Sequence, residues 1–103
     1  MKSHQDKLDQ EFVRILGNEN VYFQPPASIK LKYPCIVYEF DITDTKSASN
    51  NKYILTNRYS VKHIFKSLEN EKKDEILTNF QMIRHDNRMI ADGLYQDSFT
   101  LYY

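Results

Sequence analysis

Acidic and basic residues between positions 39 and 46 have the side chains that metal-dependent hydrolysis requires. Glu39 and Asp41 share one face of a predicted strand, and Asp44-Thr45-Lys46 has the Asp-x-Lys spacing of metal-dependent nucleases. A carboxylate pair can hold Mg²⁺ while a lysine assists the attacking water. However, the tripeptide falls in a polar loop, and the earlier aspartate that such nucleases need is absent from VYFQPP. A solvated loop explains these residues better, so we expect no metal, no cofactor, no catalytic residue and no enzyme.

The single cysteine and the three histidines are the other candidates for nucleophilic or metal chemistry. Cys35 lies inside an apolar run without a flanking base, so we expect it to pack in the core. His4, His63 and His85 lack a ligand spacing such as H-E-x-x-H, which argues against a zinc site. His63 falls on the apolar phase of a strand. We expect its ring to be partly buried and bonded to a neighbouring strand or a carboxylate.

Aromatic residues stand between basic ones in KLKY (30–33) and NRYSVKHIF (57–65), as they do on strand faces that bind single-stranded nucleic acids. Tyr53, Tyr59 and Phe65, however, alternate in register with Leu55 and Val61 in the same strand, and aromatics at period two are normally packed in a core. Basic residues on the other phase keep that face soluble: Arg58 and Lys62. A nucleic-acid-binding module therefore remains the alternative and not the leading hypothesis.

The bulk composition indicates one domain, residues 1–103, with a modest core. A chain of 103 residues buries about 60–70% of its unfolded surface. The 14 basic and 14 acidic residues leave no formal net charge, which argues against a dedicated phosphate-binding surface. The lone cysteine excludes an internal disulfide, and the first residues lack the apolar segment of a signal peptide. No apolar run approaches the ~18 residues of a membrane helix, so we expect a soluble protein that folds inside the cell.

The first half of the chain predicts one helix followed by two strands. Residues 4–16 place Leu8, Phe12, Ile15 and Leu16 on one narrow face of a helix. VYFQ (21–24) is a short strand that Pro25 and Pro26 must end, with Gln24 held extended. Residues 33–42 are apolar on both phases and predict a central strand covered on both faces. Residues 43–52 are small and polar and predict the longest loop.

The second half contains the clearest periodicity. Over residues 53–65 the odd positions are mostly apolar and the even ones include Thr56, Arg58, Ser60 and Lys62, which predicts a long strand with one solvent-exposed face. Helical spacing returns between 70 and 84, and two short strands follow at 88–91 and 98–103, joined across DGLYQD. The order α-β-β-β-α-β-β predicts a two-layer α+β domain: two helices packed on one face of a mostly antiparallel sheet of four to five strands.

The octapeptide ENVYFQPP (19–26) is close to the recognition sequence of a tag-removing protease. Engineered sites of that type continue with Gly or Ser, whereas Gln24 is followed here by two prolines, and no polyhistidine run precedes the segment. Its neighbours have the periodicities of a helix and a strand. We therefore interpret it as native sequence.

Several segments taken together resemble the small tail-completion or tail-terminator proteins of tailed bacteriophages and prophages. The resemblance covers roughly residues 8–103 and is carried by these stretches: VYFQPP (21–26), YPCIVY (33–38), NNKY, NRYSVKHI and MIADGLYQDSFTLYY. The first two are the most specific. The tag-like octapeptide thus belongs to the family pattern.

The resemblance implies a non-enzymatic component of the virion neck, assembled in the cytoplasm of the bacterial host. Such proteins typically form a hexameric ring at the head-proximal end of the tail, end the polymerisation of the tube protein, and present a surface to the head connector. DNA passes through the ring without specific binding. A connector stopper or adaptor protein is the alternative within the neck.

A ring requires two different patches on each subunit, joined head to tail. The sequence offers a polar loop, a wet strand face and an aromatic chain end as contact surfaces. We expect the contacts to involve Asp44, Lys46, Asn50 and Asn51 in the loop, Arg58 and Lys62 on the strand, and Tyr102 and Tyr103 at the end. A nearly neutral subunit also suits a passage through which DNA must slide.

Overall fold

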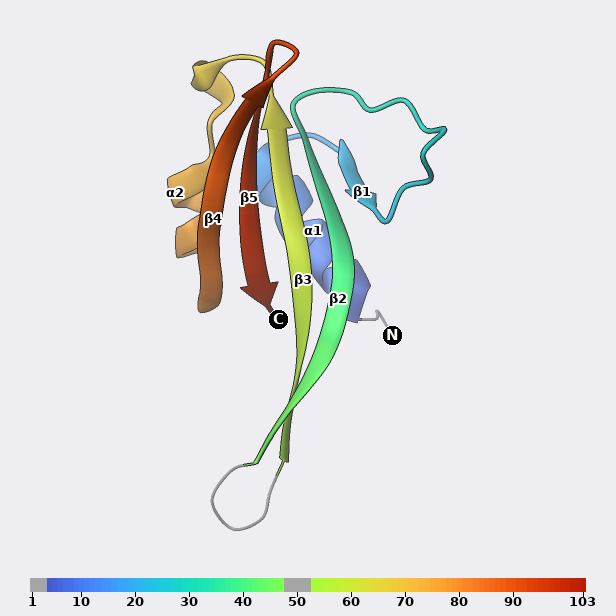
Figure 1. The fold of residues 1–103 in the computed structure, drawn as a ribbon, viewed down its shortest axis with the longest axis vertical. Helices are drawn as coiled ribbons and strands as arrows, with labels where there is room; N and C mark the ends of the chain where they lie inside the picture. The colour runs from blue at the N-terminus through green and yellow to red at the C-terminus, as the bar shows by residue number, and fades with distance from the viewer. Residues whose placement is uncertain (1–3, 48–52) are drawn as a thin grey trace.

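The computed structural model describes the backbone of residues 4–47 and 53–103, and the side chains of residues 6–42 and 57–103. The elements in chain order are α1 (His4–Leu16), β1 (Val21–Phe23), β2 (Cys35–Ser47), β3 (Tyr53–Phe65), the 3₁₀ turn η2 (Leu68–Asn70), α2 (Lys73–Thr78), β4 (Met82–Ala91) and β5 (Leu94–Tyr102). In these residues, five strands form one sheet in the order β1-β2-β3-β5-β4 (Figure 1). Neighbouring strands are antiparallel except β1 and β2, which are parallel.

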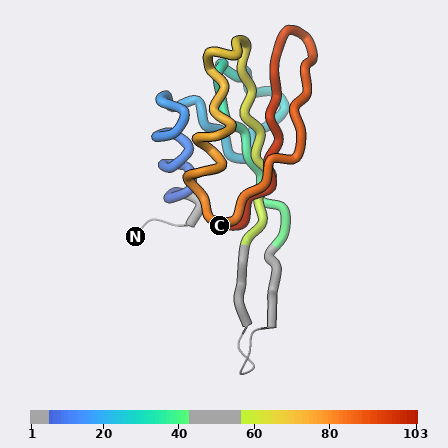
Figure 2. The backbone as a smooth tube through the Cα atoms, turned by 90° about the vertical axis from the view of Figure 1, so that its left-hand side faces the viewer, coloured from blue at the N-terminus to red at the C-terminus, as the bar shows by residue number. Residues whose placement is uncertain are grey.

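The molecule has two layers, with both helices on one side of the sheet (Figure 2). The predicted α+β class and the order α-β-β-β-α-β-β are confirmed. Arg14 of α1 donates a hydrogen bond to the side-chain oxygen of Asn79, just after α2, at 2.7 Å. This contact links the two helices. None of the helices in the described residues has the length and apolarity needed to cross a bilayer.

The core lies between α1, α2 and the covered face of the sheet. The predicted stripe on α1 is buried, and it meets the alternate residues of three strands. Phe12 packs edge-on against Tyr38, with ring centroids 5.0 Å apart. The Tyr38 hydroxyl donates to Asp9 at 2.8 Å, so the buried tyrosine keeps its polar end satisfied. The main core residues are Leu8, Phe12, Ile15, Leu16, Ile36, Tyr38, Tyr59, Val61, Ile76, Phe99 and Leu101.

The edge strand β1 ends at Phe23, as the two prolines require, but the expectation of an extended Gln24 is wrong. Gln24 has a φ of +46°. Its backbone N–H donates to the carbonyl of Tyr38 at 2.9 Å, and its side-chain oxygen accepts from the N–H of Phe40 at 3.1 Å. These two bonds to β2 hold Gln24 in the left-handed region despite the following proline.

β2 is covered on both faces at its start, whereas the prediction extended this coverage along the whole strand. Cys35, Ile36 and Tyr38 are fully buried, but Phe40 is 42% exposed. The strand also begins two residues later than expected, at Cys35. In the described chain, β1 pairs only with residues 36–38 of β2, so the sheet has fewer strands beside the second half of β2.

The predicted loop 43–52 is wrong over residues 43–47, where β2 continues to Ser47. Ser47 pairs with Tyr53, and a bulge between Phe40 and Ile42 resets the register. Thr43 and Thr45 are β-branched, and pairing with β3 outweighs the polar composition from which a loop was predicted. Residues 48–52 of that loop lie outside the described chain.

The predicted helix 70–84 is also wrong in extent. After η2, α2 occupies only Lys73–Thr78, and Ile83 belongs to β4, opposite Leu101. The Asn79 side chain donates to the carbonyl of Glu75 at 2.6 Å and occupies an acceptor at the end of the helix. The apolar spacing through Phe80 and Ile83 matched a helix, but the chain reaches the same core by changing to an extended strand.

The last hairpin is longer and tighter than predicted. Asp92 and Gly93 form its turn, with φ values of +54° and +75°. Positive φ at both central residues is the type I′ geometry that two-residue hairpins favour, and Asp-Gly is one of its preferred sequences. Residues 94–97, assigned to a connection from the sequence, are therefore part of β5.

Candidate functional site

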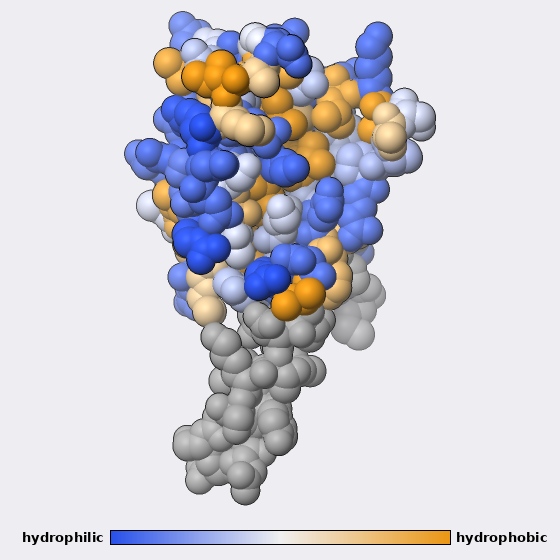
Figure 3. Space-filling model, in the orientation of Figure 1, coloured by the Kyte–Doolittle hydropathy of each residue, from blue (hydrophilic) through white to orange (hydrophobic). Residues whose placement is uncertain are grey.

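The sheet face turned away from the helices carries a row of paired charges. Arg58 of β3 lies opposite Tyr102 of β5 and donates from Nε to Asp41 Oδ2 at 2.9 Å. Hydrogen bonds to Tyr102 and then to Asp41 raise the pKa of the Arg58 guanidinium. On β4, Arg84 Nε donates to Asp86 at 2.8 Å. Figure 3 shows this face as a mixture of hydrophilic groups, dense over β4, and smaller apolar patches.

Asp86 connects the two C-terminal strands on this open face. Its second carboxylate oxygen accepts from Thr100 Oγ1 at 2.7 Å. Burial raises the pKa of Asp86, but the bonds from Arg84 and Thr100 outweigh it and leave that pKa below its ordinary value. The bulge of β4 between His85 and Asn87 places Asp86. A shallow hollow beside these groups is lined by Gln81, Met82, Ile83, Arg84, Thr100 and Tyr102.

Beneath the helices, Asp97 forms a buried ionic network that the sequence analysis missed. Asp97 is fully buried, and Arg88 donates to both of its oxygens, at 2.7 and 2.8 Å. His85 Nε2 lies 3.1 Å from Asp97 Oδ1, and Arg88 also lies 3.5 Å from Glu71. Burial raises the pKa of Asp97, but the hydrogen bonds from Arg88 and His85 hold it below its ordinary value. The network joins β4 and β5 to the segment before α2.

His63 is fully buried, which contradicts the expectation of a partly buried, bonded ring. Within the described residues, neither ring nitrogen has a hydrogen-bond partner. The ring stacks on Phe65, with centroids 4.6 Å apart and planes at 25°. Burial lowers the pKa of His63 to about 4, so the imidazole is neutral at physiological pH. His63 lies opposite Asp97 in the register of β3 and β5. The Asp97 carboxylate, however, is hydrogen-bonded to Arg88 and His85.

Cys35 is packed in the interior, as expected. It is fully buried, and burial raises the pKa of its thiol to about 11, so the reactive thiolate is scarce at neutral pH. Across residues 6–42 and 57–103, no three His, Cys, Asp or Glu side chains come together in a metal-binding arrangement. Glu39 lies in β2 beside the bulge, and Asp41 is engaged by Arg58.

Among the described side chains, the two aromatic residues on the apolar phase of β3 face the core; the side chain of Tyr53 lies outside the described residues. Tyr59 is 3% exposed and Phe65 is fully buried. Tyr59 also lies in the core cluster with Val61. The packing interpretation of Tyr59 and Phe65 is confirmed, and the face on which the nucleic-acid-binding alternative depended is covered by the helices.

The expected contact residues fall on different parts of the molecule. Arg58 and Lys62 lie on the open face of β3, and Tyr102 joins Arg58 there. Tyr103, expected with Tyr102 to form contacts at the chain end, is half-buried like Tyr102 but packs against the core, with its ring centroid 6.0 Å from that of Phe80. The two tyrosines therefore face opposite sides of the sheet.

The remaining expected contacts lie in or near the long β2–β3 hairpin. Asp44 pairs with Thr56, and Lys46 pairs with Ile54, so both are strand residues. Asn50 and Asn51 lie outside the described residues. Within the described backbone, residues 44–47 and 53–56 pair with each other and with no other strand (Figure 1). We call this two-stranded extension, 44–47 with 53–56, the arm.

Comparison of the chain with protein-family models, with curated proteins and with solved structures finds no match. The site must therefore be interpreted from its geometry, and from the sequence segments that suggested a neck protein.

Proposed function

We propose that this chain is a structural subunit of the neck of a tailed phage or prophage. In this role, copies of the chain form a ring at the head-proximal end of the tail, stop the growth of the tube and join the tail to the head connector. DNA passes through the ring without specific binding. The virion is its place of action.

The arm is the observation that carries this proposal. The arm begins where the pairing of β3 with β5 stops: Arg58 pairs with Tyr102, the carbonyl of Asn57 accepts from the N–H of Tyr103 at 3.0 Å, and residues 53–56 of β3 pair with β2 alone in the described backbone. A lone two-stranded ribbon is marginally stable in water, because few contacts offset the entropy of ordering it. Such an element gains stability when it lies against another molecule. The arm is therefore explained if this chain is a subunit that contacts its neighbours in an assembly.

The two most specific segments of the resemblance contact each other in the fold. Val21 pairs with Ile36, Tyr22 with Val37, and Phe23 with Tyr38, so VYFQPP and YPCIVY form the parallel ladder between β1 and β2. Their residue types thus have a joint structural reason. This arrangement supports the resemblance as a feature of one fold and not of two unrelated peptides.

The open face also suits a ring around DNA. Two of its basic groups, Arg58 and Arg84, are each bonded to a carboxylate, Asp41 and Asp86 respectively. Paired charges weaken the field that would attract phosphates, and affinity for DNA grows with the number of phosphates neutralised. These two pairs therefore reduce the attraction of this face for a passing duplex.

Tube length tests the proposal directly. The gene is deleted from its parent phage, and tails are measured by negative-stain electron microscopy with and without a plasmid copy of the gene. We expect overlong or headless tails in the deletion, and uniform, joined tails after complementation. Normal tails of normal length in the deletion would reject the function. Normal length with unjoined heads would instead assign the chain to the connector side, as a stopper or adaptor.

A further inference from the structure

The loop between β1 and β2 is a basic patch with an apolar centre. Residues 24–34 contain two lysines and no acidic residue. Lys30 and Lys32 are both exposed, and Ile29 beside them is 43% exposed. Lys66, just after β3, has its Nζ 5.8 Å from the ring centroid of Tyr33. We call residues 29–32 the basic loop.

The opposite edge of the molecule is an acidic patch with its own apolar residues. Residues 68–79, which include η2 and α2, contain four acidic residues against two lysines, a formal charge of −2. Glu69 and Asp74 are exposed. Leu68 is 57% exposed and Ile90, near the end of the edge strand β4, is 68% exposed. We call this surface, Leu68, Glu69, Asp74 and Ile90, the acidic edge.

Two contacts define what is available at the acidic edge. Arg88 lies 3.5 Å from Glu71, which places the end of β4 beside the η2–α2 segment and leaves Glu71 engaged within the molecule. Glu75 is likewise 3.5 Å from Lys72. Glu69 and Asp74 are the exposed acids that remain for a partner.

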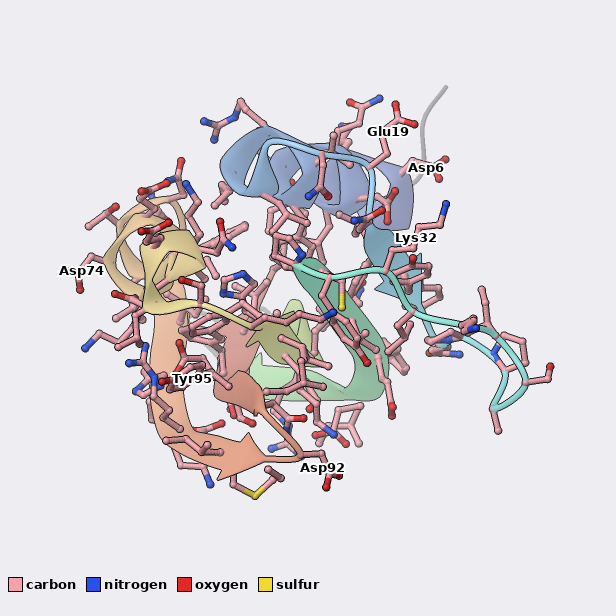
Figure 4. The ribbon with its side chains drawn as sticks, turned by 90° about the horizontal axis from the view of Figure 1, so that it is seen from above. Asp6, Glu19, Lys32, Asp74, Asp92 and Tyr95 are labelled. Atoms are coloured by element: carbon pink, nitrogen blue, oxygen red, sulfur yellow. The ribbon has the colours of Figure 1, made fainter. Side chains whose placement is uncertain are left out.

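The basic loop and the acidic edge lie at opposite sides of the sheet. β1 and β4 are the two ends of the strand order. Figure 1 shows the β1–β2 loop and the η2–α2 segment on opposite sides, and Figure 4 shows Lys32 and Asp74 on opposite sides when the molecule is seen from above. Two copies placed side by side in the same sense would bring one patch against the other.

We propose that the partner of the acidic edge is the basic loop of a second copy of this chain. Ile29 packs against Leu68 and Ile90, while Lys30 and Lys32 face Glu69 and Asp74 of the neighbour. The two patches differ, so the contact is heterologous and can close into a ring. A symmetric contact of either patch with itself would bring like charges together and is disfavoured. The inference rests on the proposed function, because it identifies the lateral contact of the ring.

Paired charge reversals test this contact. One variant carries Lys30→Glu with Lys32→Glu, and the other carries Glu69→Lys with Asp74→Lys. Sedimentation velocity over a concentration series at low salt measures self-association of the wild type and of each variant. We expect each variant to associate about tenfold more weakly or worse, since two attractive pairs become repulsive. An equimolar mixture of the two variants should recover wild-type association, because each loop then meets an edge of opposite charge.

Lys7→Glu is the matched control, because it changes an exposed charge on α1 and leaves both patches and all the expected contact residues intact. It should associate like the wild type. Circular dichroism and thermal melting must show that every variant is folded. A monomeric wild type at all concentrations, unchanged association in the reversed variants, or a mixture that does not recover would each overturn the contact.

The contact and the function fail separately. If the mixture recovers association but tails in the deletion phage have normal length and are joined, the contact stands and the neck role falls. If tail length depends on the chain but association ignores the reversals, the neck role stands and the ring uses another surface.

Discussion

Arg88 donates two hydrogen bonds to the buried carboxylate of Asp97, from Nε to Oδ1 at 2.7 Å and from Nη2 to Oδ2 at 2.8 Å. The guanidinium also lies over the ring of Phe65, 5.6 Å from its centroid. Asp97 is fully buried, whereas the Arg88 side chain is 31% exposed. A buried anion needs such a partner, because its desolvation is otherwise uncompensated. This pair fixes the edge strand β4 onto β5 near the hairpin end.

Arg88→Ala should therefore destabilise the domain well beyond the loss of a surface ion pair. Removing the partner of a buried charge costs about 3–5 kcal/mol, and the partial exposure of Arg88 reduces our expectation to about 2–3 kcal/mol. Urea unfolding followed by circular dichroism measures the change. Arg84→Ala is the control, since that side chain is 71% exposed and its bond to Asp86 lies in solvent. Equal losses in the two variants would contradict the role given to Asp97.

The stability of the protein should fall as the pH drops from about 6.5 to about 4, and His63 should cause much of this fall. Its pKa is about 4 in the folded chain, against 6.5 for an ordinary histidine, so over this range the unfolded state takes up a proton and the folded state does not. A pKa difference of one between the two states corresponds to about 1.4 kcal/mol, so the full loss of stability is about 3 kcal/mol. Unfolding in urea at pH 7, 6, 5 and 4 measures it.

His63→Leu is the informative variant for this pH dependence. It removes two buried nitrogens that have no partner among the described residues, so stability at pH 7 should be equal to or above that of the wild type. The loss between pH 6.5 and 4 should largely disappear. The low pKa of Asp97 acts in a different range: its contribution is present above pH 3.8 and is lost at lower pH, in wild type and variant alike. An unchanged slope in His63→Leu would contradict the assignment.

Strong periodicity explains which elements were predictable. Residues 4–16 and 53–65 keep one apolar phase over thirteen residues each, and both were predicted with the bounds that the structure has. The span 70–84 failed because Ile76, Phe80 and Ile83 fit a helical period, although the chain turns into a strand at Met82. Sequence spacing cannot distinguish these cases when partners elsewhere in the chain decide them.

The candidate site was less predictable, since it depends on register. Asp97 was assigned to a connection, although it shares the alternating phase of Phe99 and Leu101 and so belongs to the core face. Extending the alternation of Leu101 and Phe99 by two residues toward the N-terminus reaches Asp97, and this was the sequence signal for a buried acidic residue. Its partner Arg88 reaches it because the bulge in β4 shifts the pairing, and nothing in the composition of that strand indicates a bulge.

Gly93→Ala should destabilise the last hairpin through the backbone alone. Gly93 has a φ of +75°, and a Cβ built there has no atom within 4 Å, so steric contact with other residues contributes nothing. A left-handed conformation costs an L-residue about 1–2 kcal/mol, and we expect a loss of about 1 kcal/mol in urea unfolding. Asp92→Gly, which also removes a side chain from the turn, should lose no stability from strain, since glycine adopts its φ of +54° freely. A larger loss in Asp92→Gly than in Gly93→Ala would argue against strain as the cause.

Deleting the arm should separate assembly from folding. Thr43 pairs directly with Asn57, so residues 44–56 can be replaced by Asn-Gly to close the hairpin with a type I′ turn. The removed residues make no strand pairing to β1, β5 or β4 in the described backbone, so the shortened domain should keep its stability to within about 1 kcal/mol. The same chain, supplied to the deletion phage, should not restore normal tails. A shortened domain that fails to fold would show that the arm supports the core, and one that restores tails would show that the neck contact lies elsewhere.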